Sequence, residues 1–203
     1  MKNEPIRGGN FVKDRLPWLV GGAALVFYLA TLNHWISYLN TAQVARISGY
    51  VWQPELLSPL YVLVTWPLRW VPPGWVPLAV NVFSAVCAAL TLGLLARAVA
   101  LLPHDRTNAQ RERETSDDAL LSGGLSWLPP VFAALVCGLQ LTFWEHGTNG
   151  TSEMLNLLGF AYVIRACLEY RLDERESWLY KAALIFGALM TSDWFMIALL
   201  PGF

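Results

Sequence analysis

The sequence predicts an all-α protein, a polytopic bundle of transmembrane helices with about five spans and one interfacial helix. Of its 203 residues, 55% are hydrophobic and 14% are charged, where a soluble domain has about 45–50% and about 25%. Ten residues are tryptophan, which collects at membrane–water interfaces. The net charge is −1, whereas a nucleic-acid-binding domain carries an excess of basic residues, so nucleic acid is excluded as a partner. Membrane lipid is the expected partner.

Five apolar stretches approach the roughly 20 residues that a helix needs to cross a bilayer. The first, residues 16–36, follows Lys13 and Arg15 and has no cleavage site after it, which predicts an uncleaved anchor. Arg165 and Glu169 lie near one end of the fourth stretch, where we expect them to reach the headgroups. The remaining stretches are residues 76–102, 127–144, 154–170 and 179–203.

Residues 57–70 are also apolar, but the segment is short and contains Pro59, Pro67 and Arg69. We therefore expect it to lie on the membrane interface in the first outer loop. Residues 103–126 are polar and predict a cytoplasmic loop. Because the last span ends without a charged flank, we expect residues 1–203 to be one transmembrane domain that is truncated at its C-terminus.

The distribution of cations predicts the orientation of the chain, because cytoplasmic segments of membrane proteins are rich in Lys and Arg. With a cytoplasmic N-terminus, the outer segments contain only Arg46 and Arg69. The inner segments contain all the other cations, which are Lys2, Arg7, Lys13, Arg15, Arg97, Arg106, Arg111, Arg113, Arg165, Arg171, Arg175 and Lys181.

The few polar residues on the outer side are the candidates for chemistry. Arg46 and Arg69 are the outer cations, and a guanidinium group can hold a phosphate through its planar fork of donors; simple headgroup contact is the plainer interpretation. Glu55 lies between them in sequence, and a carboxylate near a phosphate suits general-base catalysis on a hydroxyl. Glu153 has a structural alternative, as an acid in the first turn of a helix capped by Thr151 or Ser152.

Other residue types add little to these candidates. Glu145 and His146 are neighbours that can bind a metal or move a proton, but two residues are not a ligand set. The three cysteines lack metal-ligand spacing, so no metal site is predicted. The sequence motifs do not indicate which cofactor, if any, the protein binds. Asp193 lies within the fifth predicted span and is the sole support for a transporter.

Several stretches together resemble a bacterial membrane-protein family of unknown function that is related to protein O-mannosyltransferases, within the GT-C glycosyltransferases. The stretches are Ser58-Pro-Leu-Tyr-Val-Leu, Asn81-Val-Phe-Ser-Ala-Val-Cys-Ala-Ala-Leu, Phe143-Trp, Gly150-Thr-Ser-Glu-Met-Leu, Phe160-Ala-Tyr-Val-Ile-Arg and Leu168-Glu-Tyr-Arg. The resemblance is to the amino-terminal part of that family and extends over nearly all of the chain after Leu16.

The resemblance implies transfer of a sugar from a polyprenyl-phosphate donor to a protein or glycan hydroxyl on the extracytoplasmic side of a bacterial inner membrane. It also implies an acid early in the first outer loop, but residues 34–41 contain none. We therefore expect Glu55 or Glu153, which stands where the family carries an acid, to be catalytic, and Arg46 and Arg69 to bind the donor phosphate. The alternative is a non-catalytic carrier or scaffold that has lost the acid.

Overall fold

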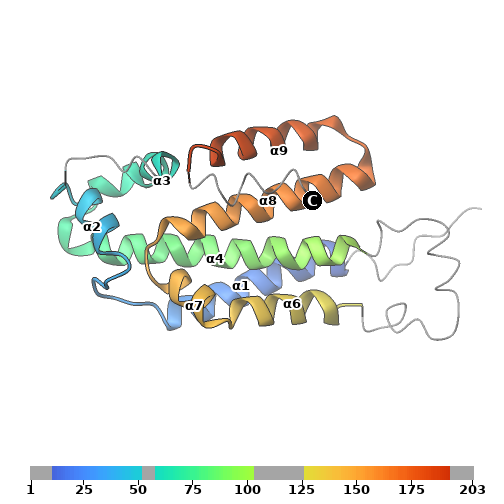
Figure 1. The fold of residues 1–203 in the computed structure, drawn as a ribbon. Coiled ribbons are helices and arrows are strands. Elements are labelled where there is room, and N and C mark those ends of the chain that lie inside the picture. The colour runs from blue at the N-terminus through green and yellow to red at the C-terminus, as the bar shows by residue number, and fades with distance from the viewer. Residues whose placement is uncertain (1–10, 52–57, 103–125, 193–203) are drawn as a thin grey trace, which may run out of the picture.

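The computed structural model describes residues 11–51, 58–102 and 126–192, and every regular element within them is a helix, as the sequence predicts. The longest is α4, Val76–Leu101, which continues the short 3-10 turn η3, Pro73–Trp75. Figure 1 shows α4 running through the middle of the bundle, with α1, α6 and α8 beside it. Its small side chains, among them Ala85, Ala88 and Ala89, are buried and let the neighbouring helices approach closely.

The first predicted span ends earlier than the sequence suggests. Helix α1 is Leu16–Ala30 and follows the π-helical turn η1, Phe11–Arg15, so residues 31–36 are not helical. Asn33 explains the difference, because its side-chain oxygen accepts a hydrogen bond from the amide of Trp35 at 3.0 Å. Such local bonds compete with the helix for the backbone.

The predicted span 127–144 is not one straight helix either. Its residues form α6, Leu128–Gly138, and α7, Leu141–Thr148, which meet at an angle of 71°. The bend leaves the carbonyl of Gly138 at the break, and the buried hydroxyl of Tyr28 donates a hydrogen bond to it at 2.8 Å. The broken backbone is thus satisfied by a side chain from α1.

The last two predicted spans are an antiparallel pair of helices. Helix α8 is Ser152–Asp173 and α9 is Glu176–Leu189; beyond Ser192 the chain lies outside the described residues. Glu174 ends α8 in the left-handed conformation, with φ of 53°, and its amide bonds to the carbonyl of Tyr170 at 2.7 Å. This residue turns the chain so that α9 packs back on α8 (Figure 1).

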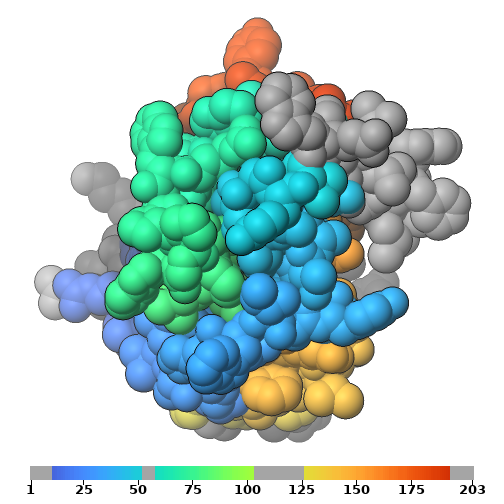
Figure 2. All heavy atoms as spheres, turned by 90° about the vertical axis from the view of Figure 1, so that its left-hand side faces the viewer, coloured from blue at the N-terminus to red at the C-terminus, as the bar shows by residue number. Residues whose placement is uncertain are grey.

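Three short helical segments cover one end of the bundle. They are α2, Thr41–Ile47, α3, Pro59–Thr65, and the 3-10 turn η2, Trp66–Trp70. Segments α3 and η2 lie within residues 57–70, for which the sequence predicts an interfacial helix. Residue 57 lies outside the described residues. Figure 2 looks onto this end, where α2 lies between the first loop and residues 58–75. We call it the loop end.

Among the described residues, one helix, Pro73–Leu101, is long and apolar enough to cross a membrane. The bent pair α6–α7 passes the same test if it counts as one broken span. Large apolar side chains are nevertheless exposed on other helices. Examples are Trp18 at 72% on α1, Phe132 at 64% on α6 and Leu184 at 70% on α9.

Candidate functional site

A network of buried amides holds the loop end together. Asn81, in the first part of α4, is fully buried, and its oxygen accepts from Asn40 Nδ2 at 2.9 Å and from the amide of Gly150 at 2.8 Å. Its nitrogen donates to the carbonyl of Asn33 at 2.6 Å. Asn33 in turn donates to Asn149 Oδ1 at 2.9 Å. One side chain of α4 therefore ties the first loop to the connection between α7 and α8.

Asn40 stands in the stretch in which the resemblance places an acid. It is fully buried, and its oxygen accepts from the amide of Ser37 at 2.7 Å while its nitrogen donates to Asn81. The described part of the first loop, residues 31–51, contains no Asp or Glu. An amide network thus occupies the place where a base was expected.

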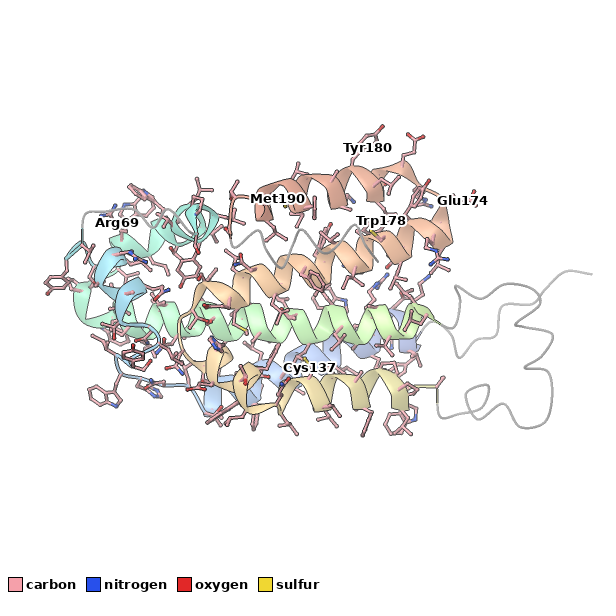
Figure 3. The ribbon with its side chains drawn as sticks, viewed as in Figure 1. Arg69, Cys137, Glu174, Trp178, Tyr180 and Met190 are labelled. Carbon is pink, nitrogen blue, oxygen red and sulfur yellow. The ribbon has the colours of Figure 1, made fainter. Side chains whose placement is uncertain are left out.

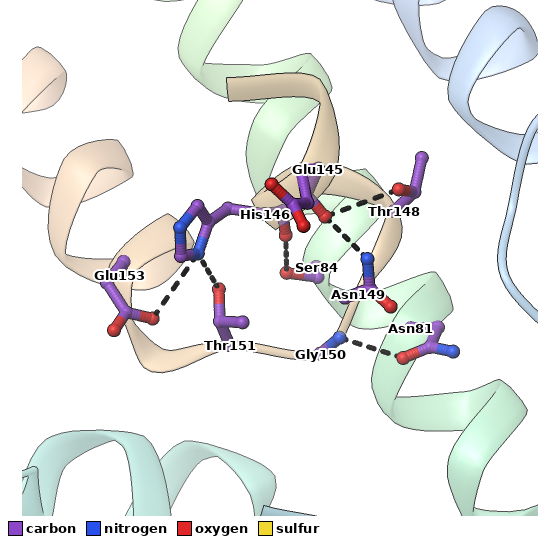
Figure 4. A network of polar contacts seen from close by, with 9 residues as sticks. All are labelled: Asn81, Ser84, Glu145, His146, Thr148, Asn149, Gly150, Thr151 and Glu153. Atoms are coloured by element: carbon purple, nitrogen blue, oxygen red, sulfur yellow. Dashed lines mark hydrogen bonds and ion pairs between the residues drawn. The ribbon is translucent and has the colours of Figure 1, made fainter. Parts of the chain in front are cut away.

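An acid does lie nearby, at the start of α8. Figure 4 shows the ring of His146 pointing toward Thr151 and Glu153 rather than toward Glu145. His146 Nδ1 lies 3.2 Å from Thr151 Oγ1 and 3.9 Å from Glu153 Oε2. The backbone of His146 is fixed as well, because its carbonyl accepts from Ser84 Oγ of α4 at 3.0 Å.

The structural alternative for Glu153 holds in part, because Glu153 lies in the first turn of α8. Thr151 is the residue that precedes α8, but its side chain makes no capping hydrogen bond to that helix. Its hydroxyl is paired with His146 instead. The carboxylate of Glu153 is 56% exposed, so it is accessible and has an imidazole beside it. The sequence missed this pair because His146 and Glu153 are brought together only by the turn between α7 and α8.

The neighbouring pair Glu145–His146 is not a joint site in the structure. Glu145 is exposed, and its backbone carbonyl, not its carboxylate, accepts from Asn149 Nδ2 at 2.8 Å. No group of three His, Cys, Asp or Glu side chains that could hold a metal ion occurs in the described ranges.

The two predicted phosphate-binding arginines lie on elements of the loop end that contact each other. Arg46 is half-buried in the last turn of α2. Arg69, on η2, is exposed, and its guanidinium carbon lies 4.6 Å from the centre of the Trp66 ring. Figure 3 shows Arg69 at this end, far from Trp178. Glu55 and Asp193 lie outside the described residues.

The opposite end of the bundle corrects one expectation. Glu169 does not reach toward the headgroups but is 2% exposed. Its Oε1 atom accepts from Arg97 Nε at 2.6 Å and lies 3.6 Å from Arg165 Nε. A carboxylate within the bundle is costly unless it is paired, and Arg97 of α4 supplies the partner.

Residues 58–203 match the family described as the N-terminal domain of the protein O-mannosyl-transferase TMEM260. The chain belongs to this family. The matched residues include Asn81, Arg69 and Glu153, whereas Arg46 and Glu55 precede them. No curated protein and no solved structure matches the chain. The family supports the relation to protein O-mannosyltransferases that the sequence suggests.

Proposed function

We propose that the chain is part of an integral membrane glycosyltransferase that moves a sugar from a polyprenyl-phosphate donor to an acceptor hydroxyl. The family supports the reaction class. The exposed apolar side chains of α1, α6 and α9 support a lipid-facing surface, because soluble monomers rarely expose large apolar patches. The charge asymmetry supports a cytoplasmic N-terminus and an extracytoplasmic loop end in a bacterial inner membrane.

The observation that carries the proposal is the contact between Glu153 and His146. Glu153 accepts the proton of the acceptor hydroxyl while the acceptor oxygen forms a bond to the anomeric carbon of the sugar. The bond between that carbon and the phosphate oxygen breaks, and the polyprenyl phosphate leaves with the electron pair. Arg46 and Arg69 bind the phosphate and stabilise its charge. Glu55 is the other candidate for the base that accepts this proton.

Aromatic residues at the loop end fit a position at the membrane surface. Trp35, Trp70 and Trp75 are 79%, 83% and 63% exposed. Tryptophan collects where the hydrocarbon meets the headgroups, which is also the depth of a lipid-linked phosphate. The loop end would therefore meet the donor at the level of its phosphate.

The test is label transfer in membranes that contain the full-length protein and radiolabelled polyprenyl-phosphate sugars. Glu153→Gln should reduce transfer at least about a hundredfold, the range of general-base catalysis. Glu145→Gln is the matched control and should retain activity, because it removes a nearby carboxylate of α7 that does not face the His146 ring. Glu55→Gln completes the series. Full activity in Glu153→Gln would refute Glu153 as the base, and full activity in both Glu55→Gln and Glu153→Gln would refute both candidates.

The burial of Asn40 favours a second candidate, a carrier or scaffold without transferase activity. An amide that is fully buried and bonded on both sides cannot act as a base. Such a protein would bind polyprenyl phosphate without turnover, and Arg46→Ala would weaken that binding. Wild-type membranes that bind the labelled lipid but never release label to protein or glycan would support this candidate.

A further inference from the structure

An apolar groove lies on the side of α4 that faces away from α6. It has a volume of about 640 Å³, within the range of about 300–1,000 Å³ that ligand pockets have. Residues of α1, α4, α8 and α9 line it, and Leu60 and Val64 of α3 also contribute. The lining is apolar except toward one end, where Arg97 and Arg165 contribute.

The arginine end of the groove carries more positive than negative charge. Arg97 is paired with the buried Glu169, and Asp14 lies 3.9 Å from it. Arg165 Nε lies 3.6 Å from the Oε1 atom of the same Glu169. Within the described part of the chain this nitrogen makes no hydrogen bond. A third cation, Lys181 of α9, lies beside the groove lining, with its ammonium 4.6 Å from the centre of the Trp178 ring (labelled in Figure 3). The Arg165 guanidinium lies 5.5 Å from the centre of the same ring.

The length of the groove matches one leaflet of a bilayer. On α4 its lining extends from Val86 to Arg97, which is on the order of 16 Å at 1.5 Å per residue. Half of a hydrocarbon core of ~30 Å is about the same depth. A chain in the groove would therefore reach from the middle of the bilayer to the arginines at its surface.

We propose that this groove binds one glycerophospholipid with an anionic headgroup, drawn from the leaflet at the Arg97 end of the bundle. Its phosphate lies against Arg165, with Arg97 and Lys181 nearby, and an acyl chain lies in the groove. The apolar lining suits an acyl chain, and the excess of cations at the arginine end suits a negatively charged headgroup. The proposal rests on the membrane placement proposed above, but not on sugar transfer or on Glu153.

Two pairs of variants test the headgroup and the chain separately. Arg165→Gln removes a cation that lines the groove, and Arg175→Gln removes one from the exposed connection between α8 and α9. Gly22→Leu fills the groove, because a Cβ at Gly22 meets no atom within 4 Å and Gly22 lines the groove. Gly187→Leu is its control, with equally open surroundings on α9 but outside the lining.

The measurement is native mass spectrometry of the purified full-length protein with dioleoylphosphatidylglycerol and dioleoylphosphatidylcholine in equal amounts. The wild type should bind one phosphatidylglycerol at least about tenfold more tightly than phosphatidylcholine, the effect of one charge-assisted contact. Arg165→Gln should lose this preference and Arg165→Lys should keep it. Gly22→Leu should weaken both lipids, while Arg175→Gln and Gly187→Leu should bind as the wild type does.

Three results would overturn the proposal. The first is a wild type without preference between the two lipids, or with no bound lipid, as expected if another part of the protein fills the groove. The second is equal binding by Arg165→Gln and Arg175→Gln. The third is equal binding by Gly22→Leu and Gly187→Leu. Because lipid binding is read without any sugar donor, failure here leaves the transferase hypothesis to its own assay.

Discussion

Replacing Asn81 by alanine should destabilise the loop end more than any other polar truncation on α4. The side chain makes three hydrogen bonds, at 2.9, 2.8 and 2.6 Å, to Asn40, Gly150 and Asn33. Each partner that loses its bond in a buried place costs about 1–3 kcal/mol. The expected loss in the free energy of unfolding is therefore about 3 kcal/mol or more.

Ser84→Ala is the matched control for Asn81→Ala. Ser84 lies on the same helix and is equally buried, but it makes a single hydrogen bond, to the carbonyl of His146 at 3.0 Å. Its loss should cost about 1 kcal/mol. Unfolding of the full-length protein in detergent, followed by circular dichroism over a denaturant series, measures both. Equal losses in the two variants would show that the network does not hold the three segments together.

Three further substitutions test other contacts in the same unfolding assay. Gly150→Ala places a Cβ against Val80 Cγ1, so it should cost about 1–3 kcal/mol by overpacking. Adding Val80→Ala should recover part of this loss; no recovery would place the strain elsewhere. Tyr28→Phe removes the hydrogen bond to Gly138 at the α6–α7 bend and should cost about 1 kcal/mol or more, whereas an unchanged stability would mean that water replaces it. Glu169→Gln removes the buried carboxylate that pairs with the half-buried Arg97 and Arg165 and leaves only Asp14 beside Arg97. It should cost about 3 kcal/mol, against about 0.5 or less for the exposed Asp173→Asn.

The helices themselves could be predicted because long apolar runs have few other stable forms. Residues 76–102 and 154–170 became α4 and α8 nearly as expected. The α6–α7 bend could not, because it depends on a partner distant in sequence, and the end of α1 could not, because it depends on how the Asn33 side chain and backbone are bonded, locally to Trp35 and distantly to Asn81. Asn81 binds the carbonyl of Asn33 from another helix, and Tyr28 binds that of Gly138 across the bundle.

The same limit applies to the candidate site. The sequence could name Glu55 and Glu153 as candidates, because acids are rare on the predicted outer side and Glu153 stands where the resembled family carries an acid. It could not pair Glu153 with His146 or show that Thr151 bonds to that histidine instead of capping α8, because both depend on how the chain turns before the helix. The placement of Glu169 was misjudged for a related reason, since its partner Arg97 is on a different helix.

The most direct test of the central claim, that Glu153 is the base of a glycosyltransferase, measures donor binding and sugar transfer on the same Glu153→Gln sample. The purified full-length variant is mixed with labelled polyprenyl-phosphate sugar, and bound and transferred label are counted. If Glu153 is the base, donor binding should stay within about threefold of the wild type and sugar transfer should fall at least about a hundredfold. Unchanged transfer would contradict this claim, and so would a wild type that binds the donor and transfers nothing.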